Sequence, residues 1–160
     1  MSDARSEVGG DPPWTAGPWP SKAGGPAPLL VRLAARFLDQ FVHGVPVVVV
    51  VLPLLFLWPE VDWILLIPLA AFAYFTIMEA KTGSTVGKRV CGLRVFGGDG
   101  AAPSVAAAAK RNAWLLIGYV PVVGVPLYFV ALVAIAATIH LRDGRRGLHD
   151  QFAGTSVVFG

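Results

Sequence analysis

Apolar residues along this chain fall into long runs without any charge. Residues 40–59, 63–78 and 112–141 contain 20, 16 and 30 consecutive residues without lysine, arginine, aspartate or glutamate. A helix of about 20 apolar residues crosses the hydrocarbon core of a bilayer, which is about 30 Å thick. Helices of a soluble core would keep a polar face, and these runs have almost none. The pattern predicts an integral membrane protein with spans at about 40–59, 63–79 and 112–139.

The first run lies inside a longer predicted helix, which begins near Leu29 and ends at about Trp58. Its two prolines, Pro46 and Pro53, would break a helix in water, but a membrane span tolerates them when neighbouring helices satisfy the freed carbonyl groups. A short acidic turn follows and is closed by Trp63. Tryptophans on both sides of a short turn are typical of an interfacial aromatic belt. The first two spans are therefore expected to form a hairpin.

The run at 112–139 is compatible with one crossing or with two. Its 28 residues would form a helix about 42 Å long, more than one span requires, whereas two full spans need about 40 residues. Strand-like sequences at 92–100 and 154–160 favour two crossings, because their pairing requires both to lie on one side of the membrane. The expected fold is an all-α membrane protein. It is a small multi-pass bundle of three to four transmembrane helices, the last region a short or re-entrant hairpin, with a small cytoplasmic β-pairing.

Basic and acidic residues are distributed unequally around these spans. Residues 80–112 carry six lysines and arginines, whereas the first hairpin turn carries only acidic residues. The positive-inside rule then predicts a multi-pass plasma-membrane protein with a cytoplasmic N-terminus. The formal net charge of +3 is explained by these flanks, so the bilayer is the expected partner and nucleic acid is not. Residues 1–28, rich in proline, glycine and tryptophan, are expected to form a disordered cytoplasmic tail before a transmembrane domain at 29–160.

Charged residues in the first helix share one face. Arg32, Arg36, Asp39 and His43 follow one another at spacings of four, three and four residues. A carboxylate at membrane depth is costly unless it is paired, and Arg36 lies one turn before Asp39. Two interpretations remain open: a salt-bridged interfacial anchor, or a site that handles protons or ions.

Further charged residues lie near the ends of the predicted spans. Asp150 is expected to pair with a basic residue of another segment, and Glu79 at the inner end of the second span is a similar candidate. One histidine, His149, beside one aspartate is too little to indicate a metal site. No nucleophile is placed near a base, so neither an enzymatic activity nor a cofactor is expected.

The stretch GSTVGKRVCG, residues 83–92, looks at first like a phosphate-binding loop. Such a loop has four residues between its glycine and Gly-Lys-Ser/Thr, and it follows a buried strand. Here three residues separate Gly83 from Gly87, Arg89 takes the place of the hydroxyl residue, and a membrane span precedes the stretch. The sequence predicts a tight turn that leaves the second span. Lys88 would then lie against the cytoplasmic leaflet or against a charged cluster.

Three sequence blocks together resemble the RDD family of small bacterial membrane proteins, and the resemblance covers residues 29–160. The blocks are RLAARFLD, GSTVGKRVCGLRV and RRGLHDQFAGTSVV, in this order along the chain. The resemblance places the arginine and the two aspartates that name the family at Arg32, Asp39 and Asp150. It places the loop motif of the middle block at Gly83, Thr85, Gly87, Lys88 and Gly92.

Most members of that family are of unknown function, and cation/proton exchange has been proposed for some. The resemblance therefore implies a non-enzymatic membrane protein that is transport-related or accessory to a membrane complex. One alternative is a monovalent cation/proton antiporter that uses Asp39. The other is an assembly subunit that binds membrane proteins through its apolar faces and its N-terminal tail. A homo-oligomer is expected if the chain forms a transport pathway, because three or four helices are few for one.

Overall fold

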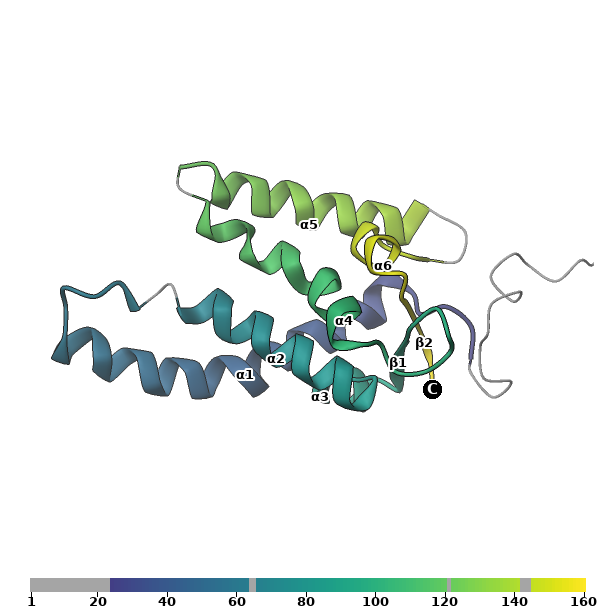
Figure 1. Cartoon of the computed structure of the whole chain (residues 1–160), viewed down its shortest axis with the longest axis horizontal. Helices are drawn as coiled ribbons and strands as arrows, with labels where there is room; N and C mark the ends of the chain where they lie inside the picture. Colours follow the sequence, from purple (N-terminus) through teal and green to yellow (C-terminus); the bar gives the residue numbers. More distant parts are fainter. Residues whose placement is uncertain (1–23, 64–65, 121, 142–144) are drawn as a thin grey trace, which may run out of the picture.

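The computed structural model describes residues 24–63, 66–120, 122–141 and 145–160 of the 160-residue chain. Most of the predicted N-terminal tail, residues 1–23, lies outside the described residues. The described chain is mostly helical (Figure 1). In chain order its elements are α1 Leu29–Leu57, α2 Leu66–Thr82, α3 Val86–Val90, β1 Leu93–Phe96, α4 Val105–Asn112, the 3₁₀ helix η2 Ala113–Tyr119, α5 Gly124–Leu141, α6 Leu148–Ala153 and β2 Ser156–Phe159.

The long helices form two hairpins. Helices α1 and α2 run in opposite directions on either side of the turn at 58–63, as the sequence predicts, and the Trp63 indole N–H donates to the Trp58 carbonyl at 3.0 Å across it. The second hairpin consists of α4 and η2 in one arm and α5 in the other. Figure 1 shows both hairpin turns at one end of the molecule and α3, α6 and the strands at the other. That second end is called the charged end below.

The last apolar run therefore reverses direction instead of forming one long helix. The first arm of this hairpin begins at Val105, before the apolar run, and its second half is the 3₁₀ helix η2. A 3₁₀ helix rises about 2.0 Å per residue instead of the 1.5 Å of an α-helix. Together these features let a short sequence build an arm of about 26 Å. The reversal is tight at Gly124, where a Cβ would lie 2.7 Å from the carbonyl oxygen of Ile117.

Two of the helices, α1 and α5, are long and apolar enough to cross a membrane. Their most apolar windows have mean hydropathies of 2.2 and 2.0, and only 11% of each window is buried within the protein. Helix α2, with 17 residues, is about 26 Å long. A soluble protein buries its most apolar helices, whereas here their side chains face outward. This exposure indicates a membrane protein.

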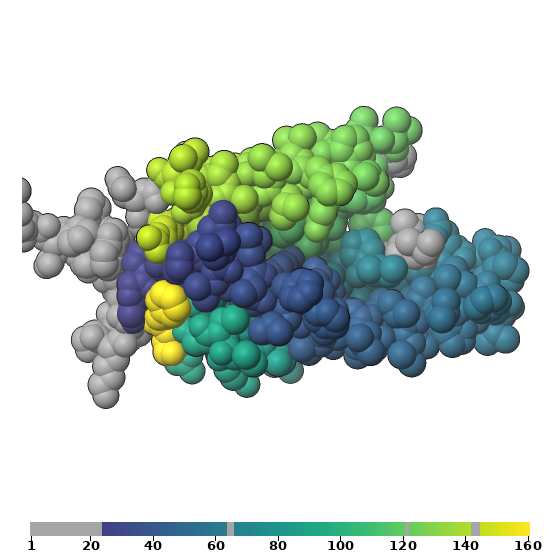
Figure 2. Space-filling model, turned by 180° about the vertical axis from the view of Figure 1, so that it is seen from behind, coloured from purple at the N-terminus to yellow at the C-terminus, as the bar shows by residue number. Residues whose placement is uncertain are grey.

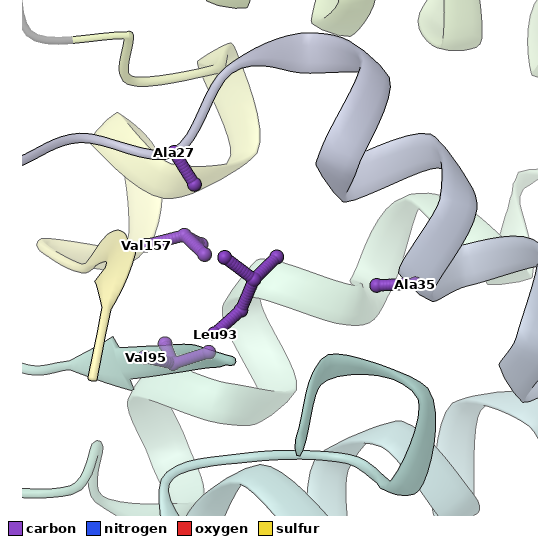
Figure 3. Close-up of a cluster of buried hydrophobic side chains, with 5 residues drawn as sticks. All are labelled: Ala27, Ala35, Leu93, Val95 and Val157. Atoms are coloured by element: carbon purple, nitrogen blue, oxygen red, sulfur yellow. The ribbon is translucent and has the colours of Figure 1, made fainter. Parts of the chain in front are cut away.

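The two short strands pair at the charged end. They are antiparallel, with Leu93 opposite Phe159 and Phe96 opposite Ser156, which confirms the predicted β-pairing. The strands cover a small core whose members are Ala27, Ala35, Leu93, Val95 and Val157. Figure 3 shows the side chains of this core, which come from both strands, from the start of α1 and from the segment before it.

The segment at 24–28 is part of this layer, so the expectation of a tail that is disordered up to residue 28 is wrong at its end. Pro26 forms a β-bridge with Val158, and the Ala27 N–H donates to the Val157 carbonyl at 3.1 Å. The Ala27 side chain is completely buried. The strand β2 would otherwise leave an unpaired edge here, and the backbone of 24–27 satisfies it.

Candidate functional site

Asp39 lies at the contact between α1 and α3, and its side chain is completely buried. Its Oδ1 accepts hydrogen bonds from the Tyr74 hydroxyl and from the Gly87 backbone N–H, both at 2.8 Å. Its Oδ2 accepts one from the Thr85 hydroxyl at 2.5 Å. Hydrogen bonds to an ionised acceptor are strong, so these three donors offset the loss of water around the carboxylate. Asp39 therefore clasps the Gly-x-Thr-x-Gly-Lys loop to α1.

The loop approaches α1 so closely that only glycine fits at position 87. A Cβ on Gly87 would lie 2.1 Å from the Ala35 carbonyl oxygen and 2.9 Å from the Asp39 Cγ. The loop turns into α3 at Thr85, whose hydroxyl caps the helix by accepting from the Lys88 N–H at 3.4 Å. The loop glycines on either side, Gly83 and Gly92, adopt φ angles of 66° and 65°. These values fit the tight path expected for this stretch.

Arg36 does not form the ion pair with Asp39 that its spacing predicts. Its guanidinium carbon instead lies 3.6 Å from the centroid of the Phe75 ring and 5.3 Å from that of Trp114. Within the described part of the chain, its Nη2 atom is buried without a hydrogen-bond partner. The predicted pair is wrong because hydroxyl and backbone donors already occupy the carboxylate, while the aromatic rings attract the cation.

Five charged side chains from five different helices form a continuous buried network at the charged end. Arg32 Nη1 lies 2.7 Å from Asp150 Oδ2. Arg111 bridges two carboxylates, with Nη2 3.2 Å from Asp150 Oδ1 and Nε 3.7 Å from Glu79 Oε2. The Lys88 ammonium completes the network on Glu79 Oε1. The pairing predicted for Asp150 and for Glu79 with basic residues of other segments is therefore present.

Arg32 fixes more than its ion pair. Its guanidinium also donates to the carbonyl oxygens of Ala27, Arg145 and Val157 at 3.0, 2.7 and 3.2 Å. One side chain of α1 thus holds the preceding segment, the approach to α6 and the strand β2. Figure 2 shows the same closeness from behind, with the C-terminal strand in yellow against the start of α1.

Sequence reasoning missed two members of this site, Arg111 and Asn112. Both are at least 97% buried, with exposures of 3% and 2%. The Asn112 amide donates to Glu79 Oε2 at 3.1 Å and to the Ala108 carbonyl at 3.0 Å. In the sequence they look like an ordinary basic flank, because the apolar run starts immediately after them. Their burial follows from packing against α2 and α6, for which the sequence carries no local signal.

The network sets the protonation of the groups that lie outside the long helices. Burial lowers the pKa of Lys88 to about 8, against the opposing effect of Glu79. Burial likewise lowers the pKa of His149 to about 4, although the neighbouring Asp150 favours its charged form. Burial alone would raise the pKa of Asp150, but Arg111 and Arg32, together with His149 when it is protonated, outweigh it and hold that pKa below its usual range. At neutral pH, Asp150 is therefore ionised and His149 is neutral.

His43 lies one turn beyond Asp39, where its Nδ1 is 2.6 Å from the Asp39 carbonyl oxygen. Its ring stacks on Tyr74 at 5.3 Å between centroids. The predicted charged face of α1 is therefore divided in the structure: Arg32 joins the ion-pair network, Asp39 and His43 contact Tyr74, and Arg36 packs on Phe75. Among the described residues, no group of three His, Cys, Asp or Glu side chains is placed to hold a metal ion.

Comparison with known proteins shows the family of this chain. A model of the RDD family matches residues 26–154. The chain belongs to the RDD family. It is also similar to a protein of Bacillus subtilis (strain 168) described as "Uncharacterized protein YckC", with 29% identity over 139 residues that cover 84% of this chain and 85% of that protein. No solved structure matches. The resemblance carried by the three sequence blocks is confirmed.

The three residues that the sequence resemblance assigns to the family signature, called the signature residues below, hold the three blocks together. Arg32, in the first block, contacts Asp150 in the last. Asp39, also in the first block, accepts from Thr85 and Gly87 in the middle block. The signature residues form two separate contacts, since Asp39 is bound by hydroxyl and backbone donors and the other two residues are bound to each other. In this RDD protein the signature thus joins segments that lie far apart in the sequence.

Proposed function

We propose that this RDD protein is a non-enzymatic, multi-pass plasma-membrane protein that acts as an accessory subunit of a membrane complex. Two features support the proposal: a charged end that is held rigidly by ion pairs, and long helices whose apolar faces are uncovered. The basic residues of the charged end and the acidic pair Glu60 and Asp62 in the opposite turn favour a cytoplasmic charged end. Two hairpins would then bring both ends of the described chain to the cytoplasmic side.

The observation that carries the accessory role is the hydrogen bonding of Asp39, both of whose carboxylate oxygens accept from donors of the protein. Three donors occupy its carboxylate, and a transported ion would have to displace them. A carboxylate held in this way stabilises a fold more readily than it exchanges ions. The outward faces of α1 and α5 offer the means of assembly, with Val49 65% exposed and Val133 66% exposed. In a membrane such faces meet lipid or the helix of another protein.

Affinity purification from native membranes tests the accessory role. The tagged protein is extracted in mild detergent and compared with two variants, Val49→Trp and Val133→Trp, which enlarge the side chains on the outward faces of α1 and α5 without adding charge. We expect one protein partner in fixed stoichiometry with the wild type, and its loss with one of the two variants. A third variant, Leu69→Trp, enlarges a side chain of α2. The accessory role is refuted if the wild type recovers no stoichiometric partner, or if all three variants recover the partner as fully as the wild type.

Cation/proton exchange is the second candidate, and the position of His43 favours it. His43 lines a cavity of about 290 Å³ among α1, α2, η2 and α5, together with Gln40 and Tyr128. A titratable group beside a cavity within a helical bundle is a common element of proton pathways. Sodium- or lithium-dependent pH changes in everted vesicles test this candidate. Exchange that is lost in His43→Gln at an unchanged melting temperature supports it, whereas wild-type vesicles that behave like empty ones exclude it.

A further inference from the structure

A second cavity lies between the start of α1 and the end of α5, and its lining has two chemically different parts. One part is apolar and includes Leu29, Leu33, Trp114, Leu132, Ala136 and Val157. The other part is polar and contains the charged residues Arg32, Arg36, Glu79, Lys88 and Arg111, with Asn112 and His149. The cavity volume of about 90 Å³ has room for several water molecules. Figure 2 shows α5 beside the start of α1 on this face.

The charged part of the lining has an excess of cations. Four cationic side chains line it, and the carboxylates in contact with them are those of Glu79 and Asp150. The excess is therefore +2 with His149 neutral. Counting the more distant Asp39, which acts on Arg36, it is still +1. Buried charge without a counter-charge is strongly unfavourable, so the cavity is suited to an anion.

Two of the cations have free donors at this place. Arg111 is 97% buried, and its Nη1 has no hydrogen-bond partner among the described residues. The same holds for the buried Nη2 of Arg36, whose guanidinium plane rests on Phe75. Guanidinium groups bind the oxygens of a phosphate through paired, charge-assisted hydrogen bonds. The free donors therefore point to a phosphate as the anion.

The apolar part of the lining indicates what carries the phosphate. Leu33 and Leu132 are 45% and 37% exposed, so the apolar wall continues outward to the uncovered faces of α1 and α5. An acyl chain can pack against such an apolar wall, whereas a free phosphate ion would gain no favourable contact from it. Basic pockets between helices at the cytoplasmic side of a membrane bind the headgroups of anionic lipids.

We propose that this cavity binds an anionic phospholipid of the cytoplasmic leaflet, with its phosphate at Arg36 and Arg111 and an acyl chain along Leu33, Leu132 and Ala136. The inference requires that the charged end faces the cytoplasm, and it is independent of the accessory role. The bound lipid would supply the negative charge that the network lacks. It would also contact both hairpins, through α1 of the first and α5 of the second.

Lipid titration of the purified protein tests the site. Phosphatidylglycerol and phosphatidylcholine with identical acyl chains are added to the detergent-solubilised full-length protein, and bound lipid is counted by native mass spectrometry. The wild type should bind one phosphatidylglycerol about tenfold more tightly than phosphatidylcholine, a ratio that corresponds to about 1.4 kcal/mol. The melting temperature of the protein is measured with each lipid and with inorganic phosphate at millimolar concentration. Phosphatidylglycerol should raise the melting temperature, and inorganic phosphate should not.

Three variants locate the site. Arg36→Met removes a free donor without leaving a carboxylate unpaired, and it should abolish the preference for phosphatidylglycerol. Ala136→Leu fills the apolar wall, leaves every charge in place, and should weaken both lipids. Arg89→Met removes an exposed arginine of α3 and is the matched control, with binding expected within about twofold of the wild type.

Several results would overturn the proposal. Equal binding of the two lipids by the wild type would remove the charge argument. An equal loss in Arg89→Met and Arg36→Met would show nonspecific attraction to the basic surface. Stabilisation by inorganic phosphate that matches that by phosphatidylglycerol would identify a soluble anion as the ligand. If Arg36→Met does not fold, unchanged lipid binding by Ala136→Leu still refutes the location.

Discussion

The contact between Gly87 and α1 allows a quantitative test of the site. Gly87→Ala adds one methyl group at the point where the loop touches α1. That Cβ would lie 2.1 Å from the Ala35 carbonyl oxygen, whereas real Cβ atoms stay at least 3.0 Å away. The two backbones must therefore separate by about 0.9 Å. Because Ala35 contributes a backbone atom of a long helix, a change of side-chain rotamer cannot relieve the clash.

The separation also weakens the clasp on Asp39. A shift of about 0.9 Å would lengthen the hydrogen bond from the Gly87 N–H to Asp39 from 2.8 Å to about 3.7 Å, beyond hydrogen-bond range. A hydrogen bond to a charged group contributes about 1.5–3 kcal/mol, and overpacking costs about 1–3 kcal/mol. The greater helix propensity of alanine recovers up to about 1 kcal/mol. The expected loss in the free energy of unfolding is therefore about 1.5–6 kcal/mol.

Thermal unfolding in detergent measures this loss, with the folded fraction after heating quantified by size-exclusion chromatography. For a chain of this size the expected decrease in melting temperature is about 10 °C. Gly44→Ala is the control, because Gly44 lies in α1, the helix that Gly87 contacts, and a Cβ there would meet nothing within 4 Å. The control should melt at or slightly above the wild-type temperature. If Gly87→Ala melts within about 2 °C of the wild type, the close approach of α3 to α1 is wrong.

Three further predictions concern the charged end. His149 takes up a proton near pH 6.5 in the unfolded chain and only near pH 4 in the folded chain, so the free energy of unfolding should rise with pH between these values. In melting temperatures measured from pH 4.5 to 7, His149→Gln should reduce this rise. Glu79→Gln and Lys88→Met each break the same buried ion pair, and each should lower the free energy of unfolding by about 3–5 kcal/mol. The double variant should lose clearly less than the sum of the two single variants. Additive losses in thermal unfolding would contradict a direct pair. Leu93→Ala should cost about 2–5 kcal/mol through the cavity it leaves in the core of the sheet layer, and a loss below about 1 kcal/mol would show that this layer is not packed.

The long helices could be predicted because their signal is local. A charge-free run of 20 residues identifies α1 without knowledge of its neighbours, and two tryptophans mark the turn after it. The strand pairing followed from two short segments that could not be stable alone. The position of the last reversal could be predicted only approximately. It depends on a switch to 3₁₀ winding in η2 and on recruitment of α4, and neither has a clear periodicity in the sequence.

The partners of the charged residues were harder to predict than their presence. Arg36 and Asp39 have an ideal helical spacing, but the spacing describes one helix in isolation. In the bundle the Thr85 hydroxyl and the Gly87 N–H reach Asp39 from another element, and the Phe75 ring attracts Arg36. Pairing across segments is decided by tertiary packing, which a single sequence does not display.

The network geometry changes what a loss of activity in a signature variant would mean. Asp39 and Asp150 are both completely buried, and each joins segments that come from different helices. Removing one partner from a buried network leaves the other partners uncompensated and destabilises the whole end of the protein. An inactive Asp39→Asn protein is therefore expected from folding alone. Evidence for ion handling requires a variant that retains the wild-type melting temperature and still loses exchange, and His43→Gln is suited to this purpose. Among the described residues, the His43 imidazole lies against a carbonyl of its own helix and against the Tyr74 and Phe75 rings. Its replacement therefore leaves in place the donors to the Asp39 carboxylate and the Arg32–Asp150 ion pair.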